Sequence, residues 1–244
     1  MGDLAEDAEP PIVWTAGAVA RRPPRRHPSR SRTGSRRSRC TGSCAPRLDA
    51  ETLRHVLDDD FATHGLETTW NELCVPALTA LGRRVTPAGD CVDAVLLLSW
   101  AIIAGLHLAA GPTNSASRAQ RALLACPEGE RHTIGLEALH AVLTERRTPA
   151  NMLGPSVPTP VLVAAADRIR PAVVVVWSQA RRTARTGLLR KLAPLAGTTI
   201  AAGPGWDEVR LPGTVVRVTT LRGATDAVTA ATVPGGRPGT SARA

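Results

Sequence analysis

From residue 121 onward, short apolar runs, three of them rich in β-branched residues, alternate with segments that have the apolar spacing of helices. Five such runs predict strands at 122–126, 151–153, 172–178, 198–203 and 214–220. Helices are expected at about 133–144, from near Pro160, at 182–192 and at 224–232. Strands that alternate with helices form parallel sheets covered by helices on both faces. We therefore predict an α/β fold, a Rossmann-type, flavodoxin-like doubly wound sheet of five strands.

Before this region, the apolar residues follow helical spacing instead. Three apolar stripes predict helices at about 53–65, 70–82 and 92–108, and a fourth helix could lie at 117–123 or in the N-terminal region. Trp70 and Trp100 are expected to pack on apolar helix faces. Residues 94–110 are apolar enough to suggest a membrane span, but the run is short and lacks basic flanks. A small helical bundle with a buried third helix is the preferred interpretation.

The positive charge of the chain is concentrated near its N-terminus. The formal net charge is +9, and residues 21–47 hold ten Arg and no acidic residue. Such a segment is either a solvated basic tail or a contact for nucleic-acid phosphates. Acidic residues at the very N-terminus argue against a secretory signal, and five scattered Cys without a CxxC pair indicate free thiols. We therefore expect a cytoplasmic protein without membrane contacts.

In a doubly wound sheet, ligands bind beyond the carboxyl ends of the strands. His132 follows the first expected strand, Gly154 the second, Ser178 the third, and the turn Gly203-Pro204-Gly205 the fourth. A neutral imidazole suits a borderline metal ion, and a carboxylate at Glu130 could orient the ring. Gly135 would let a bulky group pass beside the first turn of the helix. The alternative is a polar loop histidine that caps this helix.

This pattern resembles the signature of cobalamin-binding domains: an acid-x-His-x-x-Gly after the first strand, a Ser after the third and a Gly-rich turn after the fourth. The resemblance implies that His132 is the lower axial ligand of cobalt and that Glu130 orients it. It also implies that a nucleotide tail contacts Ser178, Gly203 and Gly205, in a crevice that Gly154 could line as a further wall. The family usually has Asp, Ser-x-Leu and Gly-Gly, where this chain has Glu130, Ser178-Gln179-Ala180 and Gly203-Pro204-Gly205.

Two further segments resemble bacterial regulators of the MerR type. Residues 64–84 are similar to the four-helix cap that precedes their cobalamin-binding domain, and residues 13–22 resemble the opening of their winged helix-turn-helix. The resemblance implies cobalamin, as adenosylcobalamin or another corrinoid, held between cap and α/β domain, with DNA as a partner and a possible homo-oligomer. Pro23, Pro24 and Pro28 interrupt the helix-turn-helix, and Val85 and Val95-Leu96 replace the cap's Trp and Glu-His.

Together these features predict four parts and a regulatory function. The parts are a degenerate helix-turn-helix remnant (1–47), a helical cap (48–117), a cobalamin-binding α/β domain (118–233) and a flexible tail (234–244). No Ser/His/acid set, paired carboxylates or phosphate loop indicates catalysis, so we expect a transcriptional regulator and not an enzyme. The alternatives are a corrinoid carrier component of a methyltransferase and a cofactor-free α/β interaction module.

Overall fold

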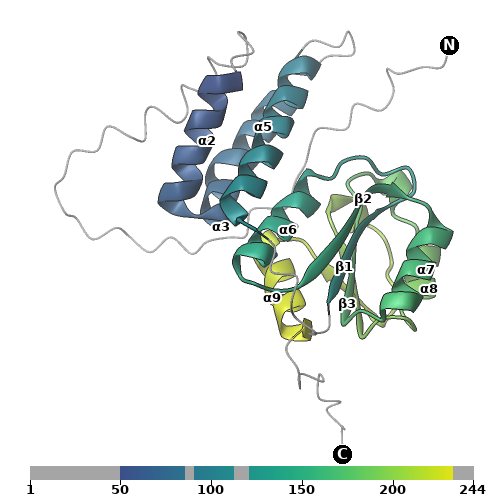
Figure 1. The fold of residues 1–244 in the computed structure, drawn as a ribbon. Helices are drawn as coiled ribbons and strands as arrows, with labels where there is room; N and C mark the ends of the chain where they lie inside the picture. The colour runs from purple at the N-terminus through teal and green to yellow at the C-terminus, as the bar shows by residue number, and fades with distance from the viewer. Residues whose placement is uncertain (1–49, 86–90, 113–120, 233–244) are drawn as a thin grey trace, which may run out of the picture. The chain divides into compact units, whose positions relative to one another are not determined.

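The computed structural model describes residues 50–85, 91–112 and 121–232, and the chain divides into two compact units between Ala110 and Gly111 (Figure 1). The predicted basic remnant, the C-terminal tail and most of the possible fourth helix lie outside the described residues.

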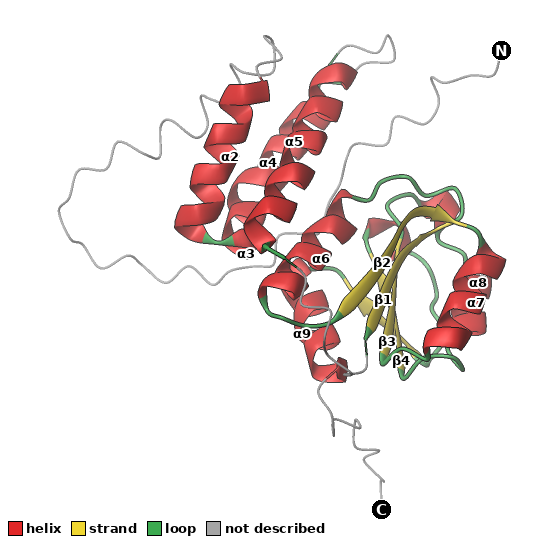
Figure 2. Cartoon of the chain, viewed as in Figure 1, coloured by secondary structure: helices red, strands yellow, loops and turns green. Residues whose placement is uncertain are grey.

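The first unit consists of helices (Figure 2). Helix α2 (Ala50–His64) ends at Gly65, whose φ of 78° suits the turn into the next helix. That helix is continuous across α3 (Leu66–Thr69), a π-helical turn η2 (Trp70–Cys74) and α4 (Val75–Gly82). Helix α5 (Val92–Ala110) packs against α2 and α4. The three apolar stripes therefore form the predicted bundle, with the second helix beginning earlier than expected.

Helix α5 shows how closely this bundle packs. A Cβ atom on Gly105 would lie 2.9 Å from the ring of Phe61 in α2, so only glycine allows this approach. Among the described residues, α5 alone is long and apolar enough to cross a membrane, and by length and composition only. Trp70 is fully buried, as predicted, but the prediction for Trp100 is wrong, because 64% of that residue is exposed.

The second unit is built on a five-stranded sheet of order β2-β1-β3-β4-β5 in which every pair is parallel. Its strands are β1 (Ala122–Pro127), β2 (Ala150–Val157), β3 (Val173–Trp177), β4 (Thr198–Ala202) and β5 (Val215–Val218). This is the flavodoxin-like order, and the predicted α/β fold is confirmed. The order reverses between β1 and β3, so the loops after these two strands flank the point where such sheets bind ligands.

Helices cover both faces of the sheet (Figure 1). Helices α7 (Thr159–Ile169) and α8 (Thr186–Leu192) pack on one face, against Val174 and Val176 of β3 among others. Helices α6 (Ile134–Glu145) and α9 (Leu221–Thr232) contact each other on the opposite face. Because side chains alternate along a strand, Trp177 of β3 points to the α6 face.

Two short 3₁₀ turns follow the central strands. Turn η3 (Arg181–Thr183) follows β3, and turn η4 (Pro204–Trp206) follows β4. Strand β2 runs on through Gly154 to Val157, with register shifts against β1, so the prediction that it ends at Gly154 is wrong. Gly154 and Pro155 usually mark the end of a strand, but a strand with a bulge tolerates both residues.

Candidate functional site

The loops after β1 and β3 are joined by one buried carboxylate. Glu130, 1% exposed, accepts hydrogen bonds on Oε1 from the backbone nitrogen of His132 at 2.9 Å and from its Nδ1 at 2.7 Å. On Oε2 it accepts from the backbone nitrogens of Gln179 at 2.9 Å and Ala180 at 3.0 Å, and from the hydroxyl of Thr183 at 2.7 Å. Both carboxylate oxygens thus accept hydrogen bonds from the protein, and these charge-assisted bonds connect the loop after β1 to the loop after β3.

These bonds determine the ionisation of Glu130. Burial alone would raise the pKa of this carboxyl above its ordinary value of 4.5. The hydrogen bonds from the His132 ring, from the backbone of Ala180 and His132, and from Thr183 outweigh burial and lower the pKa to about 2. Glu130 is therefore a carboxylate at any physiological pH.

The carboxylate in turn sets the tautomer of His132. An ionised carboxylate only accepts hydrogen bonds, so the proton of the neutral ring must be on Nδ1, facing Glu130. The lone pair is then on Nε2, and the side chain is 55% exposed. A histidine held in this way through its other nitrogen is oriented and made more basic as a metal ligand. This arrangement fits a single axial ligand to a metal ion.

Ser178 belongs to the same network through a residue that the sequence does not single out. Its buried hydroxyl lies 2.6 Å from the hydroxyl of Thr183. Because Thr183 has one proton and its strongest acceptor is the Glu130 carboxylate, Ser178 donates to Thr183. Thr183 falls in an arginine-rich stretch of no recognisable motif, so only the fold reveals its position.

The small residues predicted to line a nucleotide tail are in contact with the chain itself. A Cβ atom on Gly205 would meet the carbonyl oxygens of Ala180 at 2.6 Å and Ser178 at 2.8 Å, and one on Gly203 would meet that of Ser178 at 2.5 Å. The Gly-rich turn therefore lets β4 approach the backbone that follows β3. Its glycines are explained by internal packing, whatever else they contact.

Two residues near this turn are placed differently from a ligand-binding loop. Gly154 lies inside β2 with open space beside it, not in a loop after the strand as expected. Trp206, which follows Gly205 in the chain, is fully buried, and its Nε1 donates to the carbonyl oxygen of Val176 at 3.1 Å. It belongs to the core on the α7–α8 face and is not available to a ligand.

Solved structures with a similar arrangement include three corrinoid-related proteins, all distant. A novel cobalamin-binding protein from Desulfitobacterium hafniense is 18% identical, with 78% of this chain and 94% of that chain covered and a TM-score of 0.38. The monomethylamine corrinoid protein of Methanosarcina barkeri is 14% identical (75% and 98% covered, TM-score 0.47). The methanol:cobalamin methyltransferase complex MtaBC of the same organism is 13% identical (78% and 76% covered, TM-score 0.38).

The sequence comparisons give a nearer relative. No family model matches the chain. The HTH-type transcriptional repressor CarA of Myxococcus xanthus is 28% identical over 158 residues, which are 65% of this chain and 52% of that protein. The chain thus spans about half the length of this curated relative. This chain is similar to the CarA repressor over those residues, in agreement with the resemblance to MerR-type regulators that the sequence shows.

Proposed function

We propose that this chain is a cobalamin-binding transcriptional regulator in which His132 is the lower axial ligand of the corrinoid cobalt. The observation that carries this proposal is the pair of Glu130 and His132, joined at 2.7 Å with the carboxylate 1% exposed and the ring 55% exposed. A carboxylate that holds Nδ1 presents Nε2 as a ligand of fixed direction. Relationship to a transcriptional repressor supports the regulatory half of the proposal.

The residues of the switch point have separate tasks in this proposal. His132 would bind the cobalt, and Glu130, as a carboxylate, would orient the His132 ring. Thr183, and Ser178 through Thr183, would hold the Glu130 carboxylate in position. When bound, the corrinoid would supply a cobalt ion that can exchange a ligand. Ligation would add a bond to the loop after β1, and so favour any conformation of the chain in which that loop is ordered. We infer a non-enzymatic role in the cytoplasm, in which this preference is passed on to DNA binding or self-association.

Visible spectra test the cofactor and its ligand directly. The purified chain is mixed in the dark with hydroxocobalamin and, separately, with adenosylcobalamin. We expect a bound corrin with the spectrum of imidazole ligation, and loss of that spectrum in His132→Ala. The control is His55→Ala, which removes an exposed histidine on α2 and should leave the spectrum unchanged. Failure of the wild-type chain to bind any corrinoid, including one without the nucleotide tail, would refute the proposal.

A second candidate is a cofactor-free α/β interaction module. It is favoured by the internal contacts of Ser178, Gly203 and Gly205, which satisfy these residues without a ligand. The same titration separates the two candidates, because the interaction module predicts no spectral change with any corrinoid.

DNA binding is a separate part of the proposal. The ten Arg of residues 21–47 would neutralise phosphates, so affinity for duplex DNA should fall steeply with salt. Gel-shift titrations with and without the corrinoid, in the dark and after illumination, test whether the cofactor controls this binding. Equal affinity under all conditions would mean that the corrinoid does not regulate DNA binding by this chain.

A further inference from the structure

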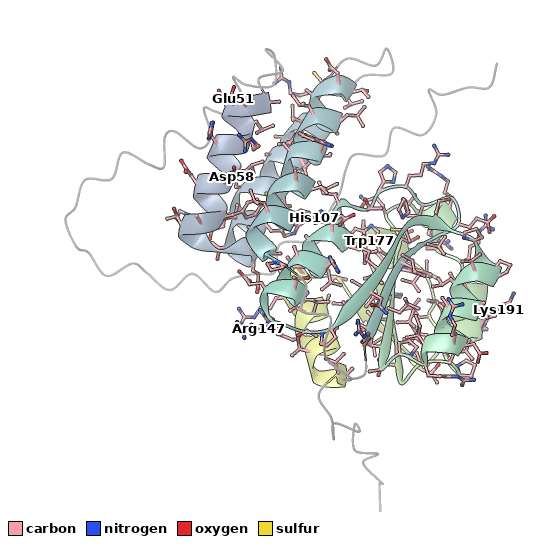
Figure 3. All side chains as sticks on the ribbon, viewed as in Figure 1. Glu51, Asp58, His107, Arg147, Trp177 and Lys191 are labelled. Atoms are coloured by element: carbon pink, nitrogen blue, oxygen red, sulfur yellow. The ribbon has the colours of Figure 1, made fainter. Side chains whose placement is uncertain are left out.

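Trp177 fills the space between the first turn of α6 and the end of β4. A Cβ atom on Gly135 would lie 2.4 Å from Cη2 and 2.5 Å from Cζ2 of its ring, and one on Gly203 would lie 3.1 Å from Cδ2 and Cε3. The residue has no exposed surface. Figure 3 marks Trp177 near α6 in the α/β unit. The two glycines therefore form the walls of a slot that the chain's own indole occupies.

This slot borders two of the positions that the resemblance assigns to a nucleotide tail. Ser178 follows Trp177 in the chain, and Gly203 lies against its ring. Gly135, expected to let a bulky group pass, lies against the same ring. The indole is a fused six-five aromatic bicycle, and so is the benzimidazole base at the end of the cobalamin tail. A flat bicycle that belongs to the chain is thus already present beside the positions assigned to the tail.

We propose that Trp177 takes the place of the lower base, so that this chain selects corrinoids whose tail carries no base for insertion. The inference rests on the proposed function and specifies its ligand. Insertion of a benzimidazole would expel a wholly buried indole, at a cost comparable to that of exposing a large apolar side chain, which corresponds to roughly ten- to hundredfold in affinity. A corrinoid without the base reaches His132 without this displacement.

The test compares aquacobinamide, which lacks the nucleotide tail, with hydroxocobalamin. Each is titrated into the full chain in the dark, and imidazole ligation is followed by visible absorption. The ratio of the two affinities is measured for wild type and for Trp177→Leu, because the intrinsic cost of detaching the base from cobalt is the same for both and cancels in the comparison. We expect the preference for cobinamide to be roughly tenfold or more greater in wild type.

Variants at two tryptophans locate the cause. Trp177→Leu opens the slot, so the preference for cobinamide should fall by roughly tenfold or more relative to wild type. Trp206→Leu is the matched control, because Trp206 is equally buried but lies in the core cluster of the opposite face, and its ratio should equal that of wild type. If Trp177→Leu does not fold, Trp177→Phe, which removes one ring of the indole, takes its place and should lower the preference in the same direction.

The outcomes separate the two proposals. A wild-type ratio near one, with cobalamin bound through His132, overturns the inference and leaves the proposed function intact. A high ratio that persists in Trp177→Leu likewise overturns it. Binding of neither corrinoid overturns the proposed function, and the inference with it.

Discussion

The Glu130 carboxylate offers the sharpest test of the network. Because its pKa in the folded protein, about 2, lies below the ordinary 4.5, the unfolded chain binds the proton more tightly. The carboxylate therefore contributes stability that is complete above about pH 5 and is lost as the pH falls toward 2. Each pKa unit corresponds to about 1.4 kcal/mol, so the difference between the two pKa values of Glu130 corresponds to roughly 3 kcal/mol of unfolding free energy.

Glu130→Gln removes the charge and turns an amide N–H₂ toward groups that are themselves donors. We expect the α/β unit to lose roughly 3 kcal/mol of unfolding free energy at pH 7, and the difference from wild type to shrink to roughly 1 kcal/mol at pH 3. Hydrogen exchange of the β3 amides, residues 173–177, reports the stability of this unit separately from the helical unit. Glu128→Gln, an exposed change in the same loop, is the control.

Two results would refute this reasoning. One is a loss of less than about 1 kcal/mol at pH 7, below the range for removing a charged hydrogen-bond partner. The other is a difference between Glu130→Gln and wild type that stays constant from pH 7 to pH 3, since the stabilisation would then not come from the ionised carboxyl.

Three further changes probe the packing around this site. Gly135→Ala places a methyl group 2.4 Å from the Trp177 ring and should destabilise the unit by about 1–3 kcal/mol, and Trp177→Leu should rescue it in a double-mutant cycle of thermal unfolding. Gly187→Ala in α8 meets no atom within 4 Å and should stabilise by about 0.5–1 kcal/mol, so a loss there would contradict the packing described. Thr183→Val leaves the buried Ser178 hydroxyl without its partner, removes one of the five hydrogen bonds to the Glu130 carboxylate and should cost about 1–3 kcal/mol. Thr183→Ser should cost much less, and equal losses would mean that packing, not the hydroxyl, matters.

The fold could be predicted because its signals are local and repeated. Runs such as "VVVV" between helical segments indicate buried parallel strands wherever they occur, and parallel strands leave few arrangements. The helical stripes before residue 111 follow from spacing in the same way. The end of β2 could not be predicted in this way, because the pairing of β2 with β1 decides whether Gly154 ends the strand or lies in a bulge.

The site was predictable only in its sequence-local part. Glu130 and His132 are two positions apart, so the spacing already suggests their contact. Thr183 reaches Glu130 across 53 positions, and no pattern in the chain points to it. Trp177 could have been noticed as a bulky residue directly before Ser178, but its position between two glycines depends on the packing of α6 and β4.

The bonds to Glu130 also bear on the order in which the chain folds. The three hydrogen bonds to its Oε2 span 49 to 53 positions, and the backbone carbonyl oxygen of Glu130 accepts from the backbone nitrogen of Ser156 in β2 at 2.8 Å. Such long-range contacts close only after β1, β2 and β3 have paired. We therefore expect them to be absent from the folding transition state, so that their loss accelerates unfolding and leaves the folding rate nearly unchanged. The loop that presents His132 would then be the last part of the sheet edge to form and the first to open.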